Sequence, residues 1–296
     1  MSSKSSAFPG LIGRRQVLAG LLATPIAGCA SLSGVELQAL GNRVDQASLD
    51  FRPLHLAARR ADDAARDEAT IRRNWPDTRH VATVRSVDVT YVLERNDSAR
   101  TQYVSMPGSR SLTDWLEDFD IFLKPEARYG IPLHRGFEDA ALAVYEDLKP
   151  RLDKAHRTHL IGYSMGAGVA AVLSLYMAED GYNLVRTTTF GQPRVTNASG
   201  VAALSRLPIT RVVNADDFVS MVPTFPFEHF GEEVILHDGP DYVYLTHQDA
   251  NRLSIGEIWR QHHGLDIAAH SSATYVARLA AKVAGARPVP YLTRLA

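Results

Sequence analysis

The chain has 296 residues, of which 45% are hydrophobic and 22% charged, and its formal net charge is −1. This composition is typical of a globular protein, and the length is sufficient for one α/β domain with a full hydrophobic core. The near-neutral charge argues against a nucleic-acid partner, which normally requires a basic stripe.

Residues 1–28 have the pattern of an export leader. Arg14 and Arg15 precede an apolar run from Val17 to Ala27, which is too short to cross a bilayer and ends in small residues. The sequence Arg-Arg-Gln-Val-Leu at the start of this run is similar to a twin-arginine export signal. We therefore expect residues 1–28 to be a signal peptide.

Cys29 is the only cysteine of the chain and ends a segment, Ile-Ala-Gly-Cys, that resembles a bacterial lipobox. In a lipobox the cysteine is lipidated, and the acyl chains anchor the protein firmly to a membrane. Ala30 follows the cysteine, which by resemblance to Gram-negative lipoproteins favours the outer membrane, facing the periplasm or the exterior. The alternative is a chance cysteine in an apolar leader. Without disulfides, the mature protein would depend on its core for stability.

The first elements after the leader are helical and then extended. Residues 29–79 are predicted to be an N-terminal helical segment packed on the domain, since residues 56–66 have the mixed charge of a solvated amphipathic helix. Residues 80–296 are predicted to be the catalytic domain. Its first strand covers residues 81–93, and residues 101–105 form the antiparallel neighbour.

Strands and helices then alternate along the chain. The expected helices cover residues 138–152, 167–175, 199–207, 255–263 and 268–283, and the expected strands cover 157–161, 185–190, 209–214, 231–237 and 241–245. This alternation predicts a mostly parallel central sheet with helices on both faces.

The segment Gly162-Tyr163-Ser164-Met165-Gly166 lies between a predicted strand and a predicted helix. A G-x-S-x-G sequence in this context is typical of a nucleophile elbow, a tight turn that presents the serine hydroxyl at the edge of an α/β sheet. Glycines flank the serine because a Cβ there would collide with the neighbouring elements. We predict that Ser164 is a catalytic nucleophile.

A serine hydroxyl needs a general base and an acid that orients the base. In α/β-hydrolases the acid follows the serine in the chain and the histidine comes last. Asp216 and Asp217 both follow the predicted strand 209–214 and both qualify as the acid. The candidate bases by position are His262, His263 and His270.

Five collinear segments between about residues 80 and 275 resemble the class 3 lipase family of α/β-hydrolases. They are residues 107–118, His134-Arg135-Gly136-Phe137, the elbow, residues 189–195, and residues 214–219 with Pro223. The resemblance implies an α/β-hydrolase fold. It favours Asp217 over Asp216 as the acid and His270 as the base, with His263 as the alternative base. The non-catalytic interpretation of His262 and His263 is an exposed helix end, where a histidine suits the helix dipole.

The resemblance also implies an oxyanion hole made by the backbone N–H groups of Met165 and Ser109. Two departures from the family pattern occur here. Pro107-Gly108-Ser109 lacks the family's arginine, and Gly-Tyr-Ser-Met-Gly-Ala replaces Gly-His-Ser-Leu-Gly-Gly. These changes leave each catalytic group in place, but they affect the shape of the loop and the substrate preference.

Four apolar residues follow Ser109 at helical spacing: Leu112, Trp115, Leu116 and Phe119. By resemblance to the family they form a lid over the site; the alternative is a core helix.

The resulting functional hypothesis is a serine ester hydrolase that acts on carboxylic esters of lipids. The alternatives are a phospholipase A1 and a non-catalytic envelope lipoprotein that uses the fold as a binding scaffold. The sequence has no His-Glu-x-x-His pair, P-loop or cysteine cluster, so we predict no metal and no nucleotide cofactor.

Overall fold

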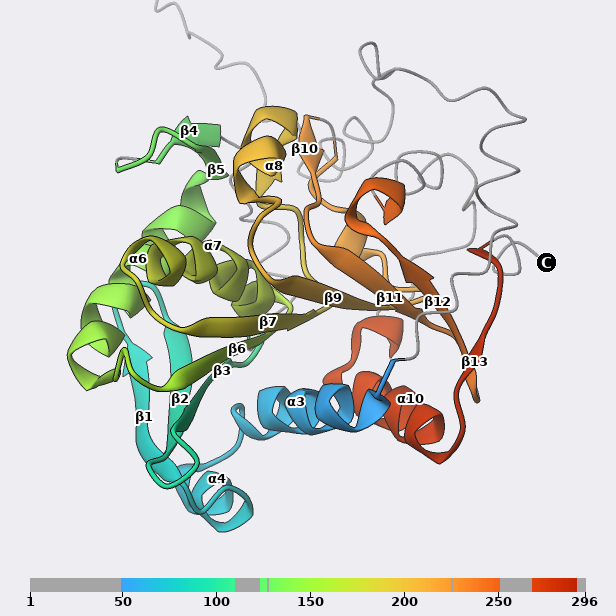
Figure 1. The fold of residues 1–296 in the computed structure, drawn as a ribbon, viewed down its shortest axis with the longest axis horizontal. Helices are drawn as coiled ribbons and strands as arrows, with labels where there is room; N and C mark the ends of the chain where they lie inside the picture. Colours follow the sequence, from blue (N-terminus) through green and yellow to red (C-terminus); the bar gives the residue numbers. More distant parts are fainter. Residues whose placement is uncertain (1–48, 110–122, 127, 225, 251–267, 292–296) are drawn as a thin grey trace, which may run out of the picture. The chain divides into compact units, whose positions relative to one another are not determined.

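The central sheet of the computed structural model has nine strands in the order β1-β2-β3-β6-β7-β9-β11-β12-β13 (Figure 1). The structure describes residues 49–109, 123–126, 128–224, 226–250 and 268–291. The strands are β1 (Thr78–Val84), β2 (Val89–Asn96), β3 (Thr101–Met106), β6 (Arg157–Tyr163), β7 (Leu184–Phe190), β9 (Ile209–Asn214), β11 (Glu232–Leu236), β12 (Asp241–Leu245) and β13 (Arg287–Pro288).

The five strands β3, β6, β7, β9 and β11 run parallel, and antiparallel pairs lie at both sides of them. Helices α6 (Arg135–Leu148) and α7 (Met165–Glu179) cover one face of the sheet, and α3 (Phe51–Asp63) and α10 (Ser272–Ala284) cover the other (Figure 1). This arrangement confirms the predicted α/β-hydrolase class, a mostly parallel sheet with helices on both faces.

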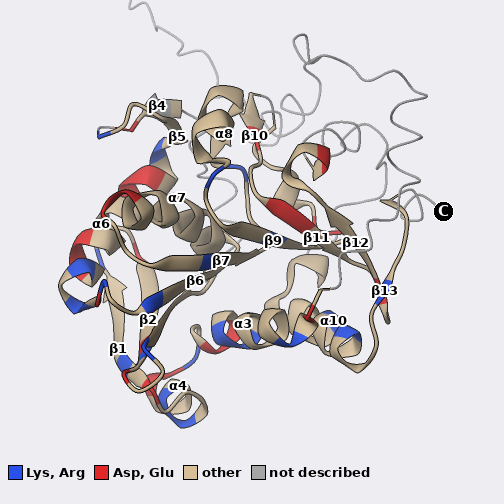
Figure 2. Ribbon diagram, in the orientation of Figure 1, with Lys and Arg blue, Asp and Glu red and all other residues tan. Residues whose placement is uncertain are grey.

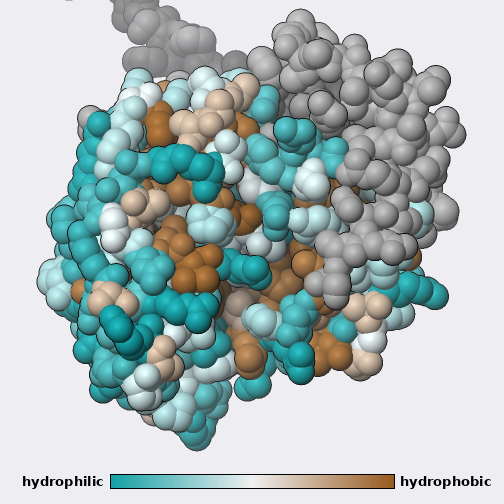
Figure 3. Space-filling view, viewed as in Figure 1, coloured by the Kyte–Doolittle hydropathy of each residue, from teal (hydrophilic) through white to brown (hydrophobic). Residues whose placement is uncertain are grey.

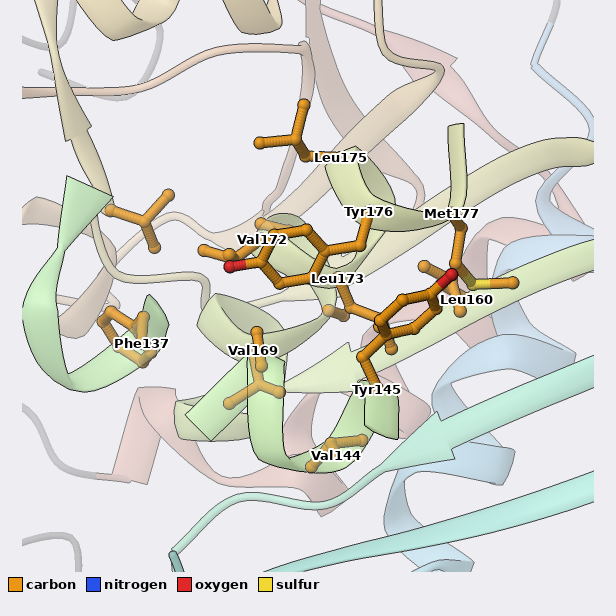
Figure 4. Close-up of a cluster of buried hydrophobic side chains, with 14 of the residues drawn as sticks. Phe137, Val144, Tyr145, Leu160, Val169, Val172, Leu173, Leu175, Tyr176 and Met177 are labelled. Carbon is orange, nitrogen blue, oxygen red and sulfur yellow. The ribbon is translucent and has the colours of Figure 1, made fainter. Parts of the chain in front are cut away.

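Alternate residues of the sheet supply two separate cores. On β6, Leu160 belongs to the cluster around α6 and α7, while Ile161 belongs to the cluster with α3 and α10. Figure 4 shows side chains of α6 and α7 meeting in the first of these clusters. A Cβ on Gly168 of α7 would lie 2.3 Å from the ring of Phe137 on α6, so a glycine is needed for this close approach of the two helices.

A second sheet of four short strands was not predicted. It has the order β10-β8-β5-β4 and lies beside helix α8 (Ala198–Leu204) (Figure 1). The strands are β4 (Leu123–Pro125), β5 (Pro132–His134), β8 (Thr196–Asn197) and β10 (Phe227–Glu228). Strands of two or three residues are too short to give a period-2 pattern in the sequence.

The single strand predicted for residues 81–93 is wrong, because the structure divides it into β1 and β2. The two strands form an antiparallel hairpin whose last pair is Val84 and Val89. Residues 85–88 form the turn, and Asp88 has a φ of 48°. Asp tolerates this left-handed conformation better than most residues, so Asp88 is the residue in the sequence that could have indicated a turn.

Two predicted helices end or begin at different residues. The helix predicted for residues 138–152 ends at Leu148 and continues only as a 3-10 turn that contains Pro150, whose ring cannot continue an α-helix. The helix predicted from residue 268 begins at Ser272, because Ser271 is extended with φ −60° and ψ 133°. His270 therefore lies in the 3-10 turn Ala268–His270 that precedes α10.

Helix α3 and the following α4 (Glu68–Asn74) are both capped by aspartates. Asp50 accepts from the backbone N–H of Arg52, and Asp67 accepts from that of Thr70. Helix α3 contacts α10 and the sheet, and it carries charges of both signs (Figure 2). The face shown in Figure 3 carries both hydrophilic and hydrophobic residues.

No helix in the described ranges is long and apolar enough to cross a membrane. The expected leader, with Arg14, Arg15 and Cys29, lies outside the described residues, as does the helix predicted for residues 255–263.

Candidate active site

Ser164 is the single residue between the end of β6 and the start of α7, and its backbone is strained, with φ 56° and ψ −123°. A Cβ on Gly162 would lie 2.3 Å from the carbonyl oxygen of Gly166. A Cβ on Gly166 would lie 2.3 Å from the carbonyl oxygen of Pro107. Only glycine fits at either position, and the resulting tight turn holds the serine at the carboxyl edge of the parallel strands.

The structure brings Ser164, His270 and Asp217 together in one line of hydrogen bonds. The Oγ atom of Ser164 lies 2.8 Å from Nε2 of His270, and Nδ1 of His270 lies 2.8 Å from Oδ2 of Asp217. A carboxylate only accepts, so Nδ1–H donates to Asp217 and Nε2 is free to accept from the Ser164 hydroxyl. All three side chains are buried, with 2% of Ser164 and of His270 and 0% of Asp217 exposed.

Asp217 is held by two further donors. Its Oδ1 accepts from the backbone N–H of Val219 at 2.9 Å, and its Oδ2 accepts from the Tyr275 hydroxyl at 2.5 Å. Burial and the Asp217 charge raise the pKa of Tyr275, so the phenol remains a donor. The Tyr275 oxygen in turn accepts from the backbone N–H of Asn214 at 3.1 Å. These contacts fix the carboxylate in the orientation that the histidine needs.

The neighbouring acid, Asp216, has no place in this network. It is exposed and pairs with Arg278 at 3.6 Å. Of the two aspartates that the sequence left open on chemistry alone, the structure therefore places Asp217 against the histidine.

Tyr163 holds the histidine from a second side. Its ring stacks on the His270 imidazole, with 5.1 Å between ring centroids and 28° between planes. Its hydroxyl donates to the backbone carbonyl of His270. Burial, and to a lesser extent the Asp217 charge, raises the pKa of Tyr163, so this phenol also remains protonated. Tyr163 thus restrains both the ring and the backbone of His270.

Two more contacts complete the surroundings of the three residues. The side-chain amide of Asn214 donates to the carbonyl of Ala269 at 2.7 Å, which joins the end of β9 to the turn that carries His270. Gly191 has a φ of 55°, and a Cβ there would lie 2.6 Å from Oδ2 of Asp217. The chain after β7 can pass this close to the carboxylate only because residue 191 is a glycine.

Of the two expected oxyanion donors, Met165 directly follows the nucleophile, and Ser109 directly follows a residue that packs against it. Met165 is the first residue of α7, and the first N–H groups of a helix have no carbonyl partner within it. A Cβ on Gly108 would lie 2.9 Å from the Cβ of Ser164, so the loop that leads to Ser109 packs directly against the elbow. The N-terminal dipole of α7 favours a negative charge at this place.

Several residues of the sequence hypothesis lie outside the described residues. These are the proposed lid, Leu112, Trp115, Leu116 and Phe119, and the rival bases His262 and His263. Conversely, sequence reasoning assigned no role to Tyr163, Gly191, Asn214 or Tyr275. Tyr163, Gly191 and Asn214 lie within segments that carry the family resemblance, and this was the only signal for them, whereas Tyr275 lies in none of the five segments.

The described residues hold no group of three or more histidines, cysteines or acids that could bind a metal ion. The site instead has the parts required for nucleophilic catalysis. They are a serine in a strained turn, a histidine that accepts its proton, and a buried acid that orients the histidine. Such an arrangement supports acyl transfer.

Comparison with known proteins agrees with this chemistry. The model of the family described as lipase (class 3) matches residues 103–227, which include Ser164 and Asp217. A lipase of Rhizomucor miehei is 30% identical over 181 residues, which are 55% of this chain and 49% of the relative. The secreted mono- and diacylglycerol lipase 1 of Fusarium solani is 28% identical over 207 residues, 64% of this chain and 58% of the relative.

A plant phospholipase is also similar to the chain: phospholipase A1-II 1 of Oryza sativa is 25% identical over 198 residues, 56% of this chain and 49% of the relative. The chain thus spans about half the length of the curated relatives it matches.

Solved structures share the fold. The triacylglyceride lipase of Rhizomucor miehei superposes with a TM-score of 0.58 and 21% identity, over 66% of this chain and 83% of that chain. Lipase II of Rhizopus niveus superposes with a TM-score of 0.56 and 20% identity, over 71% of this chain and 83% of that chain.

Proposed function

Because the chain belongs to the class 3 lipase family of α/β-hydrolases, we propose that it is a serine hydrolase that cleaves carboxylic esters of lipids. The observation that carries the proposal is the continuous line of hydrogen bonds from Ser164 through His270 to Asp217, with 2.8 Å at both steps. The line supplies the nucleophile, the general base and the orienting acid that acyl transfer requires.

In the proposed acylation step, Nε2 of His270 takes the proton of Ser164 as Oγ attacks the ester carbonyl. The negative charge that develops on the carbonyl oxygen is stabilised by the backbone N–H groups of Met165 and Ser109. The protonated His270 then donates its proton to the departing alkoxide, which leaves as an alcohol. The acyl group remains on Ser164 as an ester.

Deacylation repeats these events with water. His270 takes a proton from the water, whose oxygen attacks the acyl-enzyme, and the proton then passes to Ser164 as the carboxylic acid leaves. Asp217 stays ionised throughout and stabilises the imidazolium that forms in each half of the cycle. Its three hydrogen-bond donors, from His270, Tyr275 and Val219, keep this buried charge in place.

For the substrate we propose an acylglycerol, since the relatives named above include a lipase and a mono- and diacylglycerol lipase. The similarity to a rice phospholipase A1 favours a phospholipid as the second candidate. Hydrolysis of a triacylglycerol and of an sn-1-labelled phospholipid, each presented in the same mixed micelles, separates the two.

The test of the activity is hydrolysis of p-nitrophenyl esters of graded chain length by the protein and by its S164A variant. We expect S164A to lose activity by about 10⁴-fold or more. The matched control is S205A, at an exposed serine at the end of α8, which we expect to remain fully active. Hydrolysis by folded S164A at a rate close to that of the unmodified protein would overturn the proposal, and a protein inactive on every ester would favour a binding scaffold.

We further propose that lipidated Cys29 anchors the protein in a bacterial envelope. The support is the lipobox-like segment and the leader-like residues before it. The C29A variant is then expected to move from the membrane fraction to the soluble fraction, whereas S31A, two residues further, stays with the membrane. A C29A variant that remains membrane-bound would show that another surface holds the protein.

A further inference from the structure

Two arginines are buried beside the loop that carries Asp217. Arg211 lies on β9 with 0% of its surface exposed, and Arg194 follows β7 with 2% exposed. Arginines are almost never buried to this degree unless their charge is paired. Burial lowers the pKa of Arg194 to about 10, and the nearby Arg211 charge adds to the effect. Arg194 therefore still carries its proton at neutral pH.

Among the described residues, one carboxylate forms a hydrogen bond with this pair of arginines, and it bonds to Arg211. Nη1 of Arg211 donates at 3.0 Å to Glu233, its partner in register on β11, where Figure 2 shows acidic residues within the sheet. Nη1 of Arg194 donates at 3.3 Å to the carbonyl of Pro223, which carries no charge. The Nε and Nη2 atoms of both arginines are buried and have no hydrogen-bond partner in the structure described above.

The third member of the cluster is His229, which lies within electrostatic range of both arginines. Burial lowers the pKa of His229 well below its ordinary value, and the charges of Arg211 and Arg194 lower it further. Its ring is therefore neutral. Nε2–H donates to the carbonyl of Ser220 at 2.5 Å, so Nδ1 carries a lone pair, and this atom also lacks a partner among the described residues.

A second acid, Glu228, acts on the Arg194 charge without an ion pair. Glu228 is half-buried and forms no ion pair with Arg194 within the described part of the chain. Burial raises the pKa of Glu228 and the Arg194 charge lowers it, and the part of the side chain that is exposed to water screens this charge. The buried cluster thus holds two cations and one paired carboxylate, an excess of one positive charge. Water molecules would satisfy the free N–H groups but would leave this charge unbalanced, and an unbalanced buried charge is costly.

We propose that Arg194 and Arg211 bind a small monovalent inorganic anion of the chloride class, behind the loop that carries Asp217. One negative charge balances the excess, and an anion accepts hydrogen bonds from the unpartnered guanidinium nitrogens. The near-complete burial of both side chains favours a monatomic ion over a larger divalent oxyanion such as sulfate. The carboxylate of Glu233, which is bonded to Arg211, repels a second negative charge and limits the site to one ion.

The site is coupled to the catalytic acid through the backbone of its loop. Arg194 donates from its backbone N–H to the carbonyl of Val222 at 2.9 Å, in addition to its contact with Pro223. His229 holds the carbonyl of Ser220, and the Ser220 hydroxyl donates to the carbonyl of Asp217 at 2.8 Å. An anion that fixes the arginines therefore stabilises the loop in its present conformation.

The direct test is diffraction from crystals of the protein grown in bromide, which scatters anomalously and replaces chloride. We expect an anomalous peak within hydrogen-bond distance of Arg194 and Arg211. Water density without an anomalous peak at this position would overturn the proposal.

A solution test uses the melting temperature of the protein at constant ionic strength while chloride replaces gluconate. We expect the melting temperature to rise by about 5 °C as chloride increases to about 100 times its dissociation constant. R194M is expected to lose this dependence, and R206M, at an exposed arginine, to keep it. If R194M does not fold, the melting temperature of the unmodified protein still tests the proposal. Equal melting temperatures in chloride and in gluconate would contradict it.

Discussion

The catalytic site and the arginine cluster are both buried and both contact the loop after β9, but they differ in how completely their polar atoms are paired. In the catalytic site, both carboxylate oxygens of Asp217 and both ring nitrogens of His270 have partners at 2.5–2.9 Å. In the arginine cluster, Nε and Nη2 of Arg194 and Arg211 have none. In the first network, donors from the chain pair both oxygens of the charged carboxylate, whereas in the second, four guanidinium nitrogens have no acceptor among the described residues.

The difference indicates what each network needs from outside the protein. A fully paired network is already organised for reaction, because its dipoles need no rearrangement as charge develops on the imidazole. An incompletely paired network with an excess of one sign costs stability until a ligand of the opposite sign is bound. The following variants test whether the pairing of the catalytic site has the effects that this comparison assigns to it.

The largest effect is expected when the central acid is changed. D217N keeps the size of the side chain but removes the charge and presents an amide to His270, so we expect kcat/KM to fall by about 10⁴-fold. D216N is the matched control and is expected to stay within about twofold, since Asp216 is exposed and its ion pair with Arg278 is weak. Equal losses of ester hydrolysis in the two variants would show that Asp217 is not the acid that orients His270.

A smaller effect is expected for the outer donor. Y275F removes one hydrogen bond to the Asp217 carboxylate, and bonds to charged groups contribute about 1.5–3 kcal/mol, so we expect kcat to fall by about 10-fold or more with KM unchanged.

The control for Y275F is Y91F, which removes a tyrosine–aspartate hydrogen bond of the same 2.5 Å length, to Asp147, away from the site. We expect Y91F to lower the melting temperature without lowering kcat. A similar loss of kcat in both variants would mean that the Tyr275 bond acts only through stability.

A loss of a few-fold is expected for Y163F. The substitution keeps the ring that stacks on His270 but removes the neutral hydrogen bond to the His270 carbonyl, which contributes about 1 kcal/mol. Ester hydrolysis and thermal unfolding measure the two consequences, with Y129F at an exposed tyrosine as the control. If Y163F matches Y129F in both measurements, the turn that carries His270 is held without this bond.

The last prediction concerns the dependence of stability on pH and not activity. The folded protein keeps His229 neutral, whereas the unfolded chain protonates it below its ordinary pKa of 6.5. The unfolded state then binds more protons, so the stabilisation that is present above pH 6.5 is lost as the pH falls, by at most about 1.4 kcal/mol per pH unit. H229Q, which retains a donor for the Ser220 carbonyl, is expected to flatten this slope between pH 6.5 and pH 5. An unchanged slope, measured by denaturant unfolding, would mean that His229 binds a proton in the folded protein as readily as in the unfolded chain.

The sequence indicated the sheet and the elbow because their patterns are local. The glycines at 162 and 166 lie within four residues of each other, and the run after Ser164 is apolar on all sides, as a buried helix requires. The hairpin around Asp88 was missed because Val87 continues the apolar pattern through the turn. The short strands of the second sheet form because they pair with neighbouring strands, and their own two or three residues show no strand pattern in the sequence.

The supporting residues of the site could not be predicted from such patterns. Tyr275 and Asp217 are 58 residues apart in the chain, and Tyr163 and His270 are 107 apart, so only the folded backbone brings each pair together. The same holds for Arg194, which follows β7, and Glu233 on β11, which both interact electrostatically with Arg211 on β9. Hydrogen bonds across such separations leave no periodic trace in the sequence.

The central claim, that Ser164 is an activated nucleophile, is tested most directly by labelling the protein with a fluorophosphonate probe and mapping the adduct by peptide mass spectrometry. We predict a single adduct on Ser164 that is lost in D217N and retained in D216N. Folded protein that acquires no adduct on Ser164, with detergent present, would contradict the claim that Ser164 is activated. It would favour the alternative that the protein is a non-catalytic binding scaffold.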